Sequence, residues 1–287
     1  MFAIIEDSMK EIIDSHVHLW DLERLSYPWL KTEPGIMRTF LARDYNEAVA
    51  GWPVGKMVVV QGECDPKSYL DEVRFINAQA VEEPRIQGIV AYAPVEDPRM
   101  IAGALEELAK VPLVRGIRRM YDDHPPLCYS KTFIEGVKRL APYGFTFDIS
   151  VKPHAIPATI RMIEKCPETQ FVLDHLGKPA IAGGGWAAYR EHMAVLSSFP
   201  HVAAKISGLV TEARRSAWTD DDLAPYVHHA VEKWGVDRLL FGSDWPVVLL
   251  ASSYAKWIDT LMHILRDITP EEKVKIFYSN AARIYRL

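Results

Sequence analysis

The chain has 287 residues, of which 49% are hydrophobic and 25% are charged. This composition supplies enough apolar side chains for a large core and excludes an intrinsically disordered chain. The formal net charge of −5 leaves no excess of cations to neutralise phosphates or anionic lipid head groups. We therefore expect neither a nucleic acid nor a membrane as a partner.

The cysteines point to a reducing compartment. Cys64, Cys128 and Cys166 are odd in number and far apart, unlike a disulfide framework or a zinc knuckle. Acidic residues near the N-terminus stand where a signal peptide would be apolar, and no apolar run approaches the ~18 residues of a membrane span. We expect a cytoplasmic protein.

Eight short apolar or β-branched runs recur along the chain and predict strands. They are residues 12–14, 56–61, 86–93, 113–117, 146–149, 170–173, 202–206 and 238–241. Several are continuously apolar rather than alternating, which is typical of parallel strands buried on both faces. This pattern favours an α/β fold over a sandwich.

Segments with helical periodicity lie between these runs. They begin at Ser68, Asp97, Lys131, Pro157, Trp186, Thr219 and Ser252, and a last helix follows Thr269 with a capping box. The alternation predicts a single-domain (β/α)8 TIM-type barrel over residues 1–287, although an open doubly wound sheet alternates in much the same way. Residues 19–44, rich in Trp, Tyr and Pro, predict an irregular loop near the barrel mouth.

The strongest local signal lies just after the first run, where His16 and His18 stand two residues apart. Alternation along a strand sends both imidazoles to one face, where they can hold one metal ion. Two histidines on a strand are also common without any function. The pair therefore needs partners before it predicts a site.

Two later runs supply such partners. His175 follows the sixth run, and Asp244 follows the eighth. Alone, either residue has a structural explanation, as a hydrogen-bonding core histidine or as part of a helix-capping turn. In a closed barrel, however, the carboxyl ends of all strands meet at the catalytic rim. The sequence therefore predicts one active site built from His16, His18, His175 and Asp244.

Five segments carry a resemblance to a known family. They are DSHVHLWD (14–21), VVVQGECD (58–65), VLDHLGKP (172–179), KISGL (205–209) and FGSDWPV (241–247). With these segments the sequence resembles the amidohydrolase superfamily over essentially its whole length, and within it the lactonase branch of sugar lactonases and pyrone dicarboxylate lactonase. The resemblance implies a hydrolase that opens a small lactone ring, for which we expect a sugar (aldono) lactone.

Lactone hydrolysis assigns a role to each site residue. We expect Asp244 to be the general base and later the proton donor, and His175 to orient or polarise the carbonyl. His16 and His18 would hold a metal ion or hydrogen-bond the substrate.

The expected cofactor is at most one divalent metal ion, with zinc as the first candidate, held by His16, His18 and Asp244. The superfamily's strand-four bridging ligand and strand-five histidine have no counterpart, because the fourth run leads into Arg118 and the fifth into Ser150. A metal-independent hydrolase stays open as an alternative.

For substrate binding we expect aromatic faces and hydrogen-bonding groups, which suit a polyhydroxylated ring. The predicted residues are Trp20, Trp29, Glu63, Arg118, Asp148, Lys178 and Trp245. Each tryptophan has core packing as its alternative. A dicarboxylate pocket would need convergent arginines. Of the arginines at the fourth predicted strand, alternation turns only Arg118 inward. This favours a neutral sugar lactone.

Three alternatives accompany the sugar lactonase. They are a 2-pyrone-4,6-dicarboxylate-type lactonase, a metal-dependent nonoxidative decarboxylase, and a catalytically inactive barrel that serves as a binding protein. In every case but the last we expect a small-molecule substrate, and we expect a monomer or homodimer.

Overall fold

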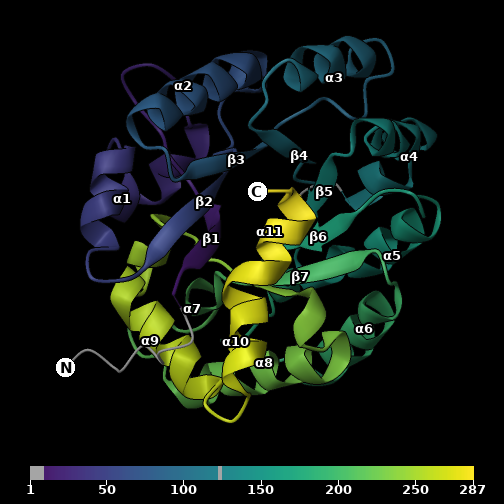
Figure 1. The fold of residues 1–287 in the computed structure, drawn as a ribbon. Coiled ribbons are helices and arrows are strands. Elements are labelled where there is room, and N and C mark those ends of the chain that lie inside the picture. The colour runs from purple at the N-terminus through teal and green to yellow at the C-terminus, as the bar shows by residue number, and fades with distance from the viewer. Residues whose placement is uncertain (1–9, 122–124) are drawn as a thin grey trace.

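The protein is an eight-stranded parallel barrel surrounded by helices (Figure 1). The computed structural model describes residues 10–121 and 125–287. The strands follow one another around a single sheet in sequence order, and each consecutive pair is parallel. They are β1 (Ile12–Val17), β2 (Val54–Val60), β3 (Ile86–Ala91), β4 (Val114–Arg118), β5 (Thr146–Ile149), β6 (Phe171–Leu173), β7 (Val202–Ile206) and β8 (Leu239–Phe241).

The sheet closes between β1 and β8. Val17 forms a parallel bridge with Trp245. The backbone N–H of Asp244 donates to the His16 carbonyl at 2.9 Å, and that of His18 donates to the Trp245 carbonyl at 2.7 Å. Closure places the first and last strands side by side and leaves the sheet without a free edge. The predicted (β/α)8 barrel is therefore confirmed, and the open sheet is excluded.

Helices occupy the connections and form the outer layer of the barrel. They are α1 (Ala42–Ala48), α2 (Tyr69–Glu82), α3 (Ile101–Ala109), α4 (Lys131–Lys138), α5 (Ile156–Glu164), α6 (Trp186–Ser198), α7 (Leu209–Glu212), α8 (Asp220–Trp234), α9 (Tyr254–Ile264), α10 (Pro270–Val274) and α11 (Asn280–Tyr285). The capping box predicted after Thr269 is present, with the Glu272 backbone N–H donating to Thr269 Oγ1 at 3.2 Å. The helix predicted from Asp97 begins only at Ile101, because the Asp97 carboxylate accepts the Arg99 backbone N–H and holds a turn there.

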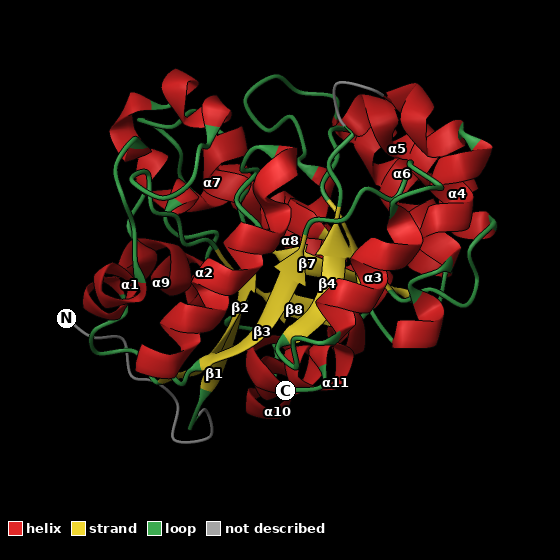
Figure 2. Ribbon diagram, turned by 90° about the horizontal axis from the view of Figure 1, so that it is seen from above, coloured by secondary structure: helices red, strands yellow, loops and turns green. Residues whose placement is uncertain are grey.

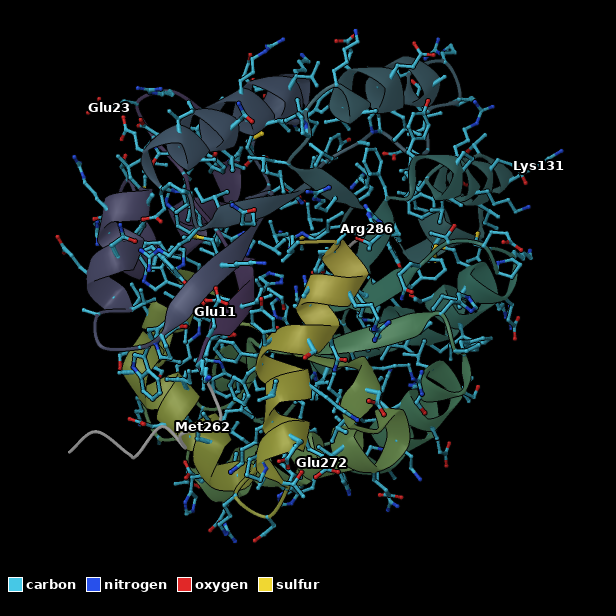
Figure 3. All side chains as sticks on the ribbon, in the orientation of Figure 1. Glu11, Glu23, Lys131, Met262, Glu272 and Arg286 are labelled. Atoms are coloured by element: carbon cyan, nitrogen blue, oxygen red, sulfur yellow. The ribbon has the colours of Figure 1, made fainter. Side chains whose placement is uncertain are left out.

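Two apolar clusters divide the core. The larger fills the space between strands and helices, where Figure 3 shows side chains packed while Glu23 and Lys131 point outward. The smaller lies inside the barrel and includes Ile13, Val58 and Val172, together with Ile284 of α11. Figure 2 shows α10 and α11 beneath the start of the strands, so the N-terminal end of the barrel is closed.

The opposite end of the barrel carries the irregular loop, which ends at residue 41 because residues 42–44 of the predicted segment begin α1. Short 3-10 turns at Pro28–Thr32 and Pro34–Ile36 replace longer elements. Its ends are tied together because Trp20 and Phe40 exchange backbone hydrogen bonds of 3.0 and 2.9 Å. Among the residues that the structure describes, no helix combines the length and the apolar character needed to cross a membrane.

Candidate active site

His16 and His18 both reach the barrel interior from the end of β1. Ile13 packs in the interior cluster, so strict alternation would turn His16, three residues later, outward. The register of β1 against β2 shifts between Asp14 and Val17, and such an irregularity re-aims the side chains that follow. As a result, His16 Nε2 lies 3.2 Å from His18 Nε2. The two imidazoles share one face, as their spacing predicts.

Asp14 holds the turn that carries Asp244. Its Oδ1 accepts the backbone N–H of Ser243 at 2.9 Å, across the seam between β1 and β8. Asp244 follows in the left-handed region with φ 59°, which aspartate tolerates better than most residues. Its Oδ1 lies 3.4 Å from His18 Nε2 and 3.6 Å from His16 Nε2.

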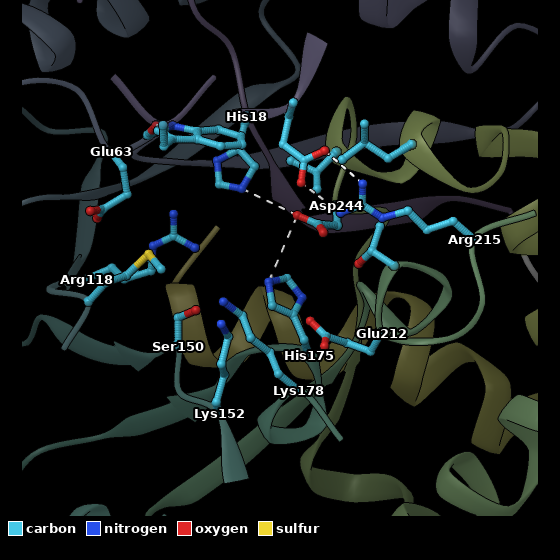
Figure 4. Close-up of a pocket in the computed structure, with 17 residues that line it drawn as sticks. His18, Glu63, Arg118, Ser150, Lys152, His175, Lys178, Glu212, Arg215 and Asp244 are labelled. Atoms are coloured by element: carbon cyan, nitrogen blue, oxygen red, sulfur yellow. Dashed lines mark hydrogen bonds and ion pairs between the residues drawn. The ribbon is translucent and has the colours of Figure 1, made fainter. Parts of the chain in front are cut away.

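His175 completes the group from the end of β6. Its Nδ1 lies 2.8 Å from Ser207 Oγ, and its Nε2 lies 4.0 Å from Asp244 Oδ1. Gly208 makes room for this imidazole, because a Cβ at that position would lie 2.5 Å from His175 Nδ1. Figure 4 shows His18, His175 and Asp244 facing one another in the pocket. We call these three residues the upper layer.

Burial and neighbouring charges give His175 and Asp244 of the upper layer different charge states near pH 7. Burial lowers the pKa of His175 to about 4, so its imidazole is neutral near pH 7. Burial raises the pKa of Asp244, but the imidazoles of His175, His18 and His16 more than offset this, and the pKa lies below its usual value. The site therefore presents a carboxylate beside a neutral imidazole.

A second set of charges lies beneath, sealed inside the barrel. Lys205 Nζ lies 2.7 Å from Asp148 Oδ2, 2.9 Å from Asp174 Oδ1 and 3.2 Å from His16 Nδ1. The hydroxyl of Tyr285, from α11, donates to Asp148 Oδ2 at 2.6 Å. All of these side chains are fully buried. We call Lys205, Asp148, Asp174 and Tyr285 the lower layer.

A pocket with a volume of about 480 Å³ opens above the upper layer. This volume suits a small molecule rather than a polymer. Besides the upper layer, its walls are formed by Trp29, Glu33, Gly62, Glu63, Arg118, Met120, Ser150, Lys152, Lys178, Thr211, Glu212, Arg215, Val247 and Leu250. Most of these side chains are polar or charged, so the pocket offers hydrogen bonds along with a few apolar contacts.

The predicted substrate-binding residues divide between the pocket wall and the core. Trp29, Glu63, Arg118 and Lys178 line the pocket, whereas Trp20, Asp148 and Trp245 do not. Trp20 is fully buried with its indole N–H on the Arg38 carbonyl at 2.7 Å, and Trp245 packs edge-on against Phe40. For these three the structure corrects the predicted placement: the tryptophans fill the core, and Asp148 pairs with Lys205 below the pocket.

Arg118 is the arginine of β4 that reaches the pocket, as strand alternation predicts. Its Nη2 donates to the Gln61 carbonyl at 2.6 Å, and its Nη1 lies 3.4 Å from Asp174 Oδ2. Arg115 does not line the pocket. Arg119 instead pairs with Glu96 at 2.7 Å. Arg215 also lines the pocket but pairs with Glu33 at 2.8 Å, so both pocket guanidiniums already face carboxylates of the protein and do not form a free pair for a dicarboxylate.

Sequence reasoning missed several residues of the site. Asp174, Lys205 and Ser207 contact the predicted histidines directly, and Ser150 lines the pocket. The available signals were a lysine inside an otherwise apolar strand and an aspartate directly before His175. Either signal marks a buried charge, which requires a partner.

The geometry of the upper layer and His16 fits a divalent metal ion. Ligand atoms about 2.0–2.1 Å from a tetrahedral zinc lie about 3.3 Å apart. His16 Nε2, His18 Nε2 and Asp244 Oδ1 are separated by 3.2, 3.4 and 3.6 Å. His18 Nδ1 lies 2.8 Å from the Val60 carbonyl, which leaves its Nε2 lone pair for a metal. These residues can therefore hold one metal ion with an open position for water.

Comparison with known proteins identifies the family of this chain. Residues 13–287 match the sequence profile of a family described as amidohydrolase. The chain is 30% identical to an L-fucono-1,5-lactonase of Burkholderia multivorans, over 96% of each chain, and 25% identical to an L-rhamnono-gamma-lactonase of Scheffersomyces stipitis, over 98% of this chain and all of that one. A crystal structure of a zinc-bound amidohydrolase from Burkholderia multivorans superposes with a TM-score of 0.87 at 29% identity, covering 96% of this chain and 99% of that one. The chain belongs to the amidohydrolase family.

Proposed function

We propose that this protein hydrolyses a sugar (aldono) lactone to the corresponding hydroxy acid, with Asp244 as the base that activates water. The observation that carries the proposal is the meeting of the Asp244 carboxylate, from the end of β8, with His18 and His175 at the floor of a small polar pocket. The similarity to proteins named as fuconolactonase and rhamnonolactonase supports a sugar lactone as the substrate class.

The proposed reaction uses two groups of the upper layer, Asp244 and His175. As the water oxygen bonds to the lactone carbonyl carbon, Asp244 accepts one proton from that water. His175, neutral because burial lowers its pKa to about 4, donates a hydrogen bond from Nε2 to the developing oxyanion, while Ser207 stands at its Nδ1. Collapse breaks the bond to the ring oxygen, and the proton passes from Asp244 to that oxygen to give the free hydroxyl group.

His16, His18 and Asp244 are the residues that would hold a zinc ion, and a similar amidohydrolase of known structure has zinc bound. When bound, the ion would lower the pKa of its water and polarise the carbonyl. Asp174 supports this arrangement from below, because its Oδ1 lies 3.3 Å from His16 Nδ1 and can orient the imidazole.

A lactone panel tests the proposed function. Aldono-γ- and δ-lactones, a pyrone dicarboxylate and unsubstituted lactones are supplied to the purified protein, and acid release is followed with a pH indicator. We expect turnover of aldonolactones. Release of carbon dioxide from aromatic acids, together with no acid release from any lactone, would instead identify a decarboxylase.

The variant Asp244→Asn tests the assignment of the base. We expect kcat to fall by at least about 10³-fold, because the amide cannot accept the proton. Asp71→Asn, an exposed carboxylate paired with Arg74 on the outer face of α2, is the control and should keep full activity. An Asp244→Asn protein that is folded by circular dichroism and still turns over at near-native rate would refute the role.

A further inference from the structure

Two buried polar atoms in the pocket wall have no hydrogen-bond partner among the residues that the structure describes. They are Ser150 Oγ and Arg118 Nε. The Ser150 side chain is 1% exposed and that of Arg118 is 4% exposed, yet both residues line the pocket. Figure 4 shows them on the side of the pocket away from Asp244.

Neighbouring strands position the two groups. Arg118, the last residue of β4, pairs in register with Asp148 of β5. Ser150 follows two residues after Asp148, so alternation directs it to the same inner face, one step closer to the pocket. The Arg118 guanidinium is fixed because Nη2 donates to the Gln61 carbonyl at 2.6 Å and Nη1 faces Asp174 at 3.4 Å. Its Nε–H is therefore a donor with a fixed position.

The chemistry of the two groups defines what they can bind. Buried polar groups in proteins almost always have a partner, and an arginine N–H can only donate, whereas a serine hydroxyl can donate or accept. The occupant must therefore offer an acceptor oxygen to Arg118. The guanidinium already faces Asp174, so the acceptor oxygen need not carry a charge. A sugar hydroxyl group can accept from Arg118 and exchange a hydrogen bond with Ser150.

We propose that Ser150 and Arg118 form a subsite for a ring hydroxyl group of the lactone, and that this subsite makes the enzyme select hydroxylated lactones over unsubstituted ones. The inference rests on the proposed function and deepens it by naming what is recognised. Ser150 is a specificity-determining residue, because it lies across the pocket from Asp244 and the reacting bond.

Substitution of Ser150 by alanine tests the subsite. For a hydroxylated aldonolactone we expect Ser150→Ala to lower kcat/KM about tenfold, mainly through KM, since one hydrogen bond is lost. For δ-valerolactone, which has no hydroxyl group to bind, we expect no change. The thermal midpoint should stay the same or rise, because the substitution removes a hydroxyl that has no partner in the ligand-free protein.

Ser197→Ala is the matched control. Ser197 is also buried, on α6, where its hydroxyl donates to the Ala194 carbonyl at 3.0 Å away from the pocket. This variant should treat both lactones as the native protein does. Equal losses on both lactones in Ser150→Ala, or no loss on either, would overturn the subsite.

Binding of a polyhydroxylated lactam, measured by calorimetry, tests the subsite independently of turnover. The lactam keeps the ring hydroxyl groups but resists hydrolysis, and we expect Ser150→Ala to weaken its binding about tenfold. Unchanged binding would overturn the subsite even if the lactone panel succeeds. If the native protein neither hydrolyses a lactone nor binds the lactam, the proposed function fails, and the subsite fails with it.

Discussion

The upper and lower layers of the barrel interior both contain buried ionisable side chains, but these side chains are paired differently in the two layers. In the lower layer, Lys205 contacts Asp148 and Asp174 at 2.7 and 2.9 Å, and Tyr285 contacts Asp148 at 2.6 Å. In the upper layer, Asp244 Oδ1 stands 3.4 Å from His18 and 4.0 Å from His175. The lower layer is held together by short ion pairs, whereas the upper layer keeps hydrogen-bonding capacity for a ligand.

The contrast between the two layers shows at which depth of the barrel polar groups can lack close partners. A buried charge that water does not reach needs an opposite charge close to it, because the free-energy cost of desolvation exceeds the stabilisation that a longer ion pair provides. Burial raises the pKa of Asp148 in spite of Lys205, while Lys205 and His16 hold the pKa of Asp174 well below its usual value. The lower layer thus supports the fold and orients His16, and the upper layer is free to act on a substrate.

Removing the buried ammonium is the largest predicted disruption of the lower layer. We expect Lys205→Met to lower the free energy of unfolding by about 3–5 kcal/mol, because Asp148 and Asp174 lose their shared cation. Denaturant unfolding followed by circular dichroism measures the change. The double variant Lys205→Met/Asp148→Asn should recover part of the loss, since it also removes a carboxylate. Native stability in Lys205→Met would show that the layer is not a structural support.

Glu72 of α2 shows the fate of a buried acid without such a cation. No ion pair to it occurs among the described residues, and its Oε1 accepts the Gly62 backbone N–H at 2.9 Å. Burial raises the pKa of Glu72 from 4.5 to about 7. Since the folded pKa is the higher one, the stability that this group contributes is full below pH 4.5 and is lost as the pH rises to about 7.

Glu72→Gln should therefore become more stable than the native protein as the pH rises. We expect little difference in the free energy of unfolding below pH 4.5 and an advantage of about 3 kcal/mol for the variant above pH 7. Unfolding curves at several pH values measure this difference. Asp71→Asn, an exposed carboxylate on the same helix, is the control and should show no such trend. A difference independent of pH would contradict the raised pKa.

The sequence predicted the fold well because its signals are local. The strands at 146–149 and 202–206 have the predicted bounds, although each run contains one charged residue, Asp148 or Lys205. Strand ends also indicated which residues share the rim, and the structure brings His16, His18, His175 and Asp244 together there.

Depth within the barrel could not be predicted in this way. Asp148 and Ser150 lie two residues apart on one face, but the first is sealed in the lower layer and the second lines the pocket. Lys205 would ordinarily be expected at the surface. Its burial depends on Asp148 and Asp174 from two other strands, a coincidence in space that no single segment of sequence contains.

The smallest predicted effect lies at the pocket mouth. Arg215 pairs with Glu33 through two contacts of 2.8 Å, joining the irregular loop to the segment after α7, and its side chain is 44% exposed. We expect Arg215→Gln to lower the free energy of unfolding by less than about 1 kcal/mol, and less still at high salt. Arg74→Gln breaks a more exposed ion pair outside the pocket and should cost no more than Arg215→Gln. Arg215 lines the pocket and Arg74 does not, so KM should rise a few-fold in Arg215→Gln and stay constant in Arg74→Gln. Equal KM values in the two variants would show that the pocket mouth takes no part in holding the substrate.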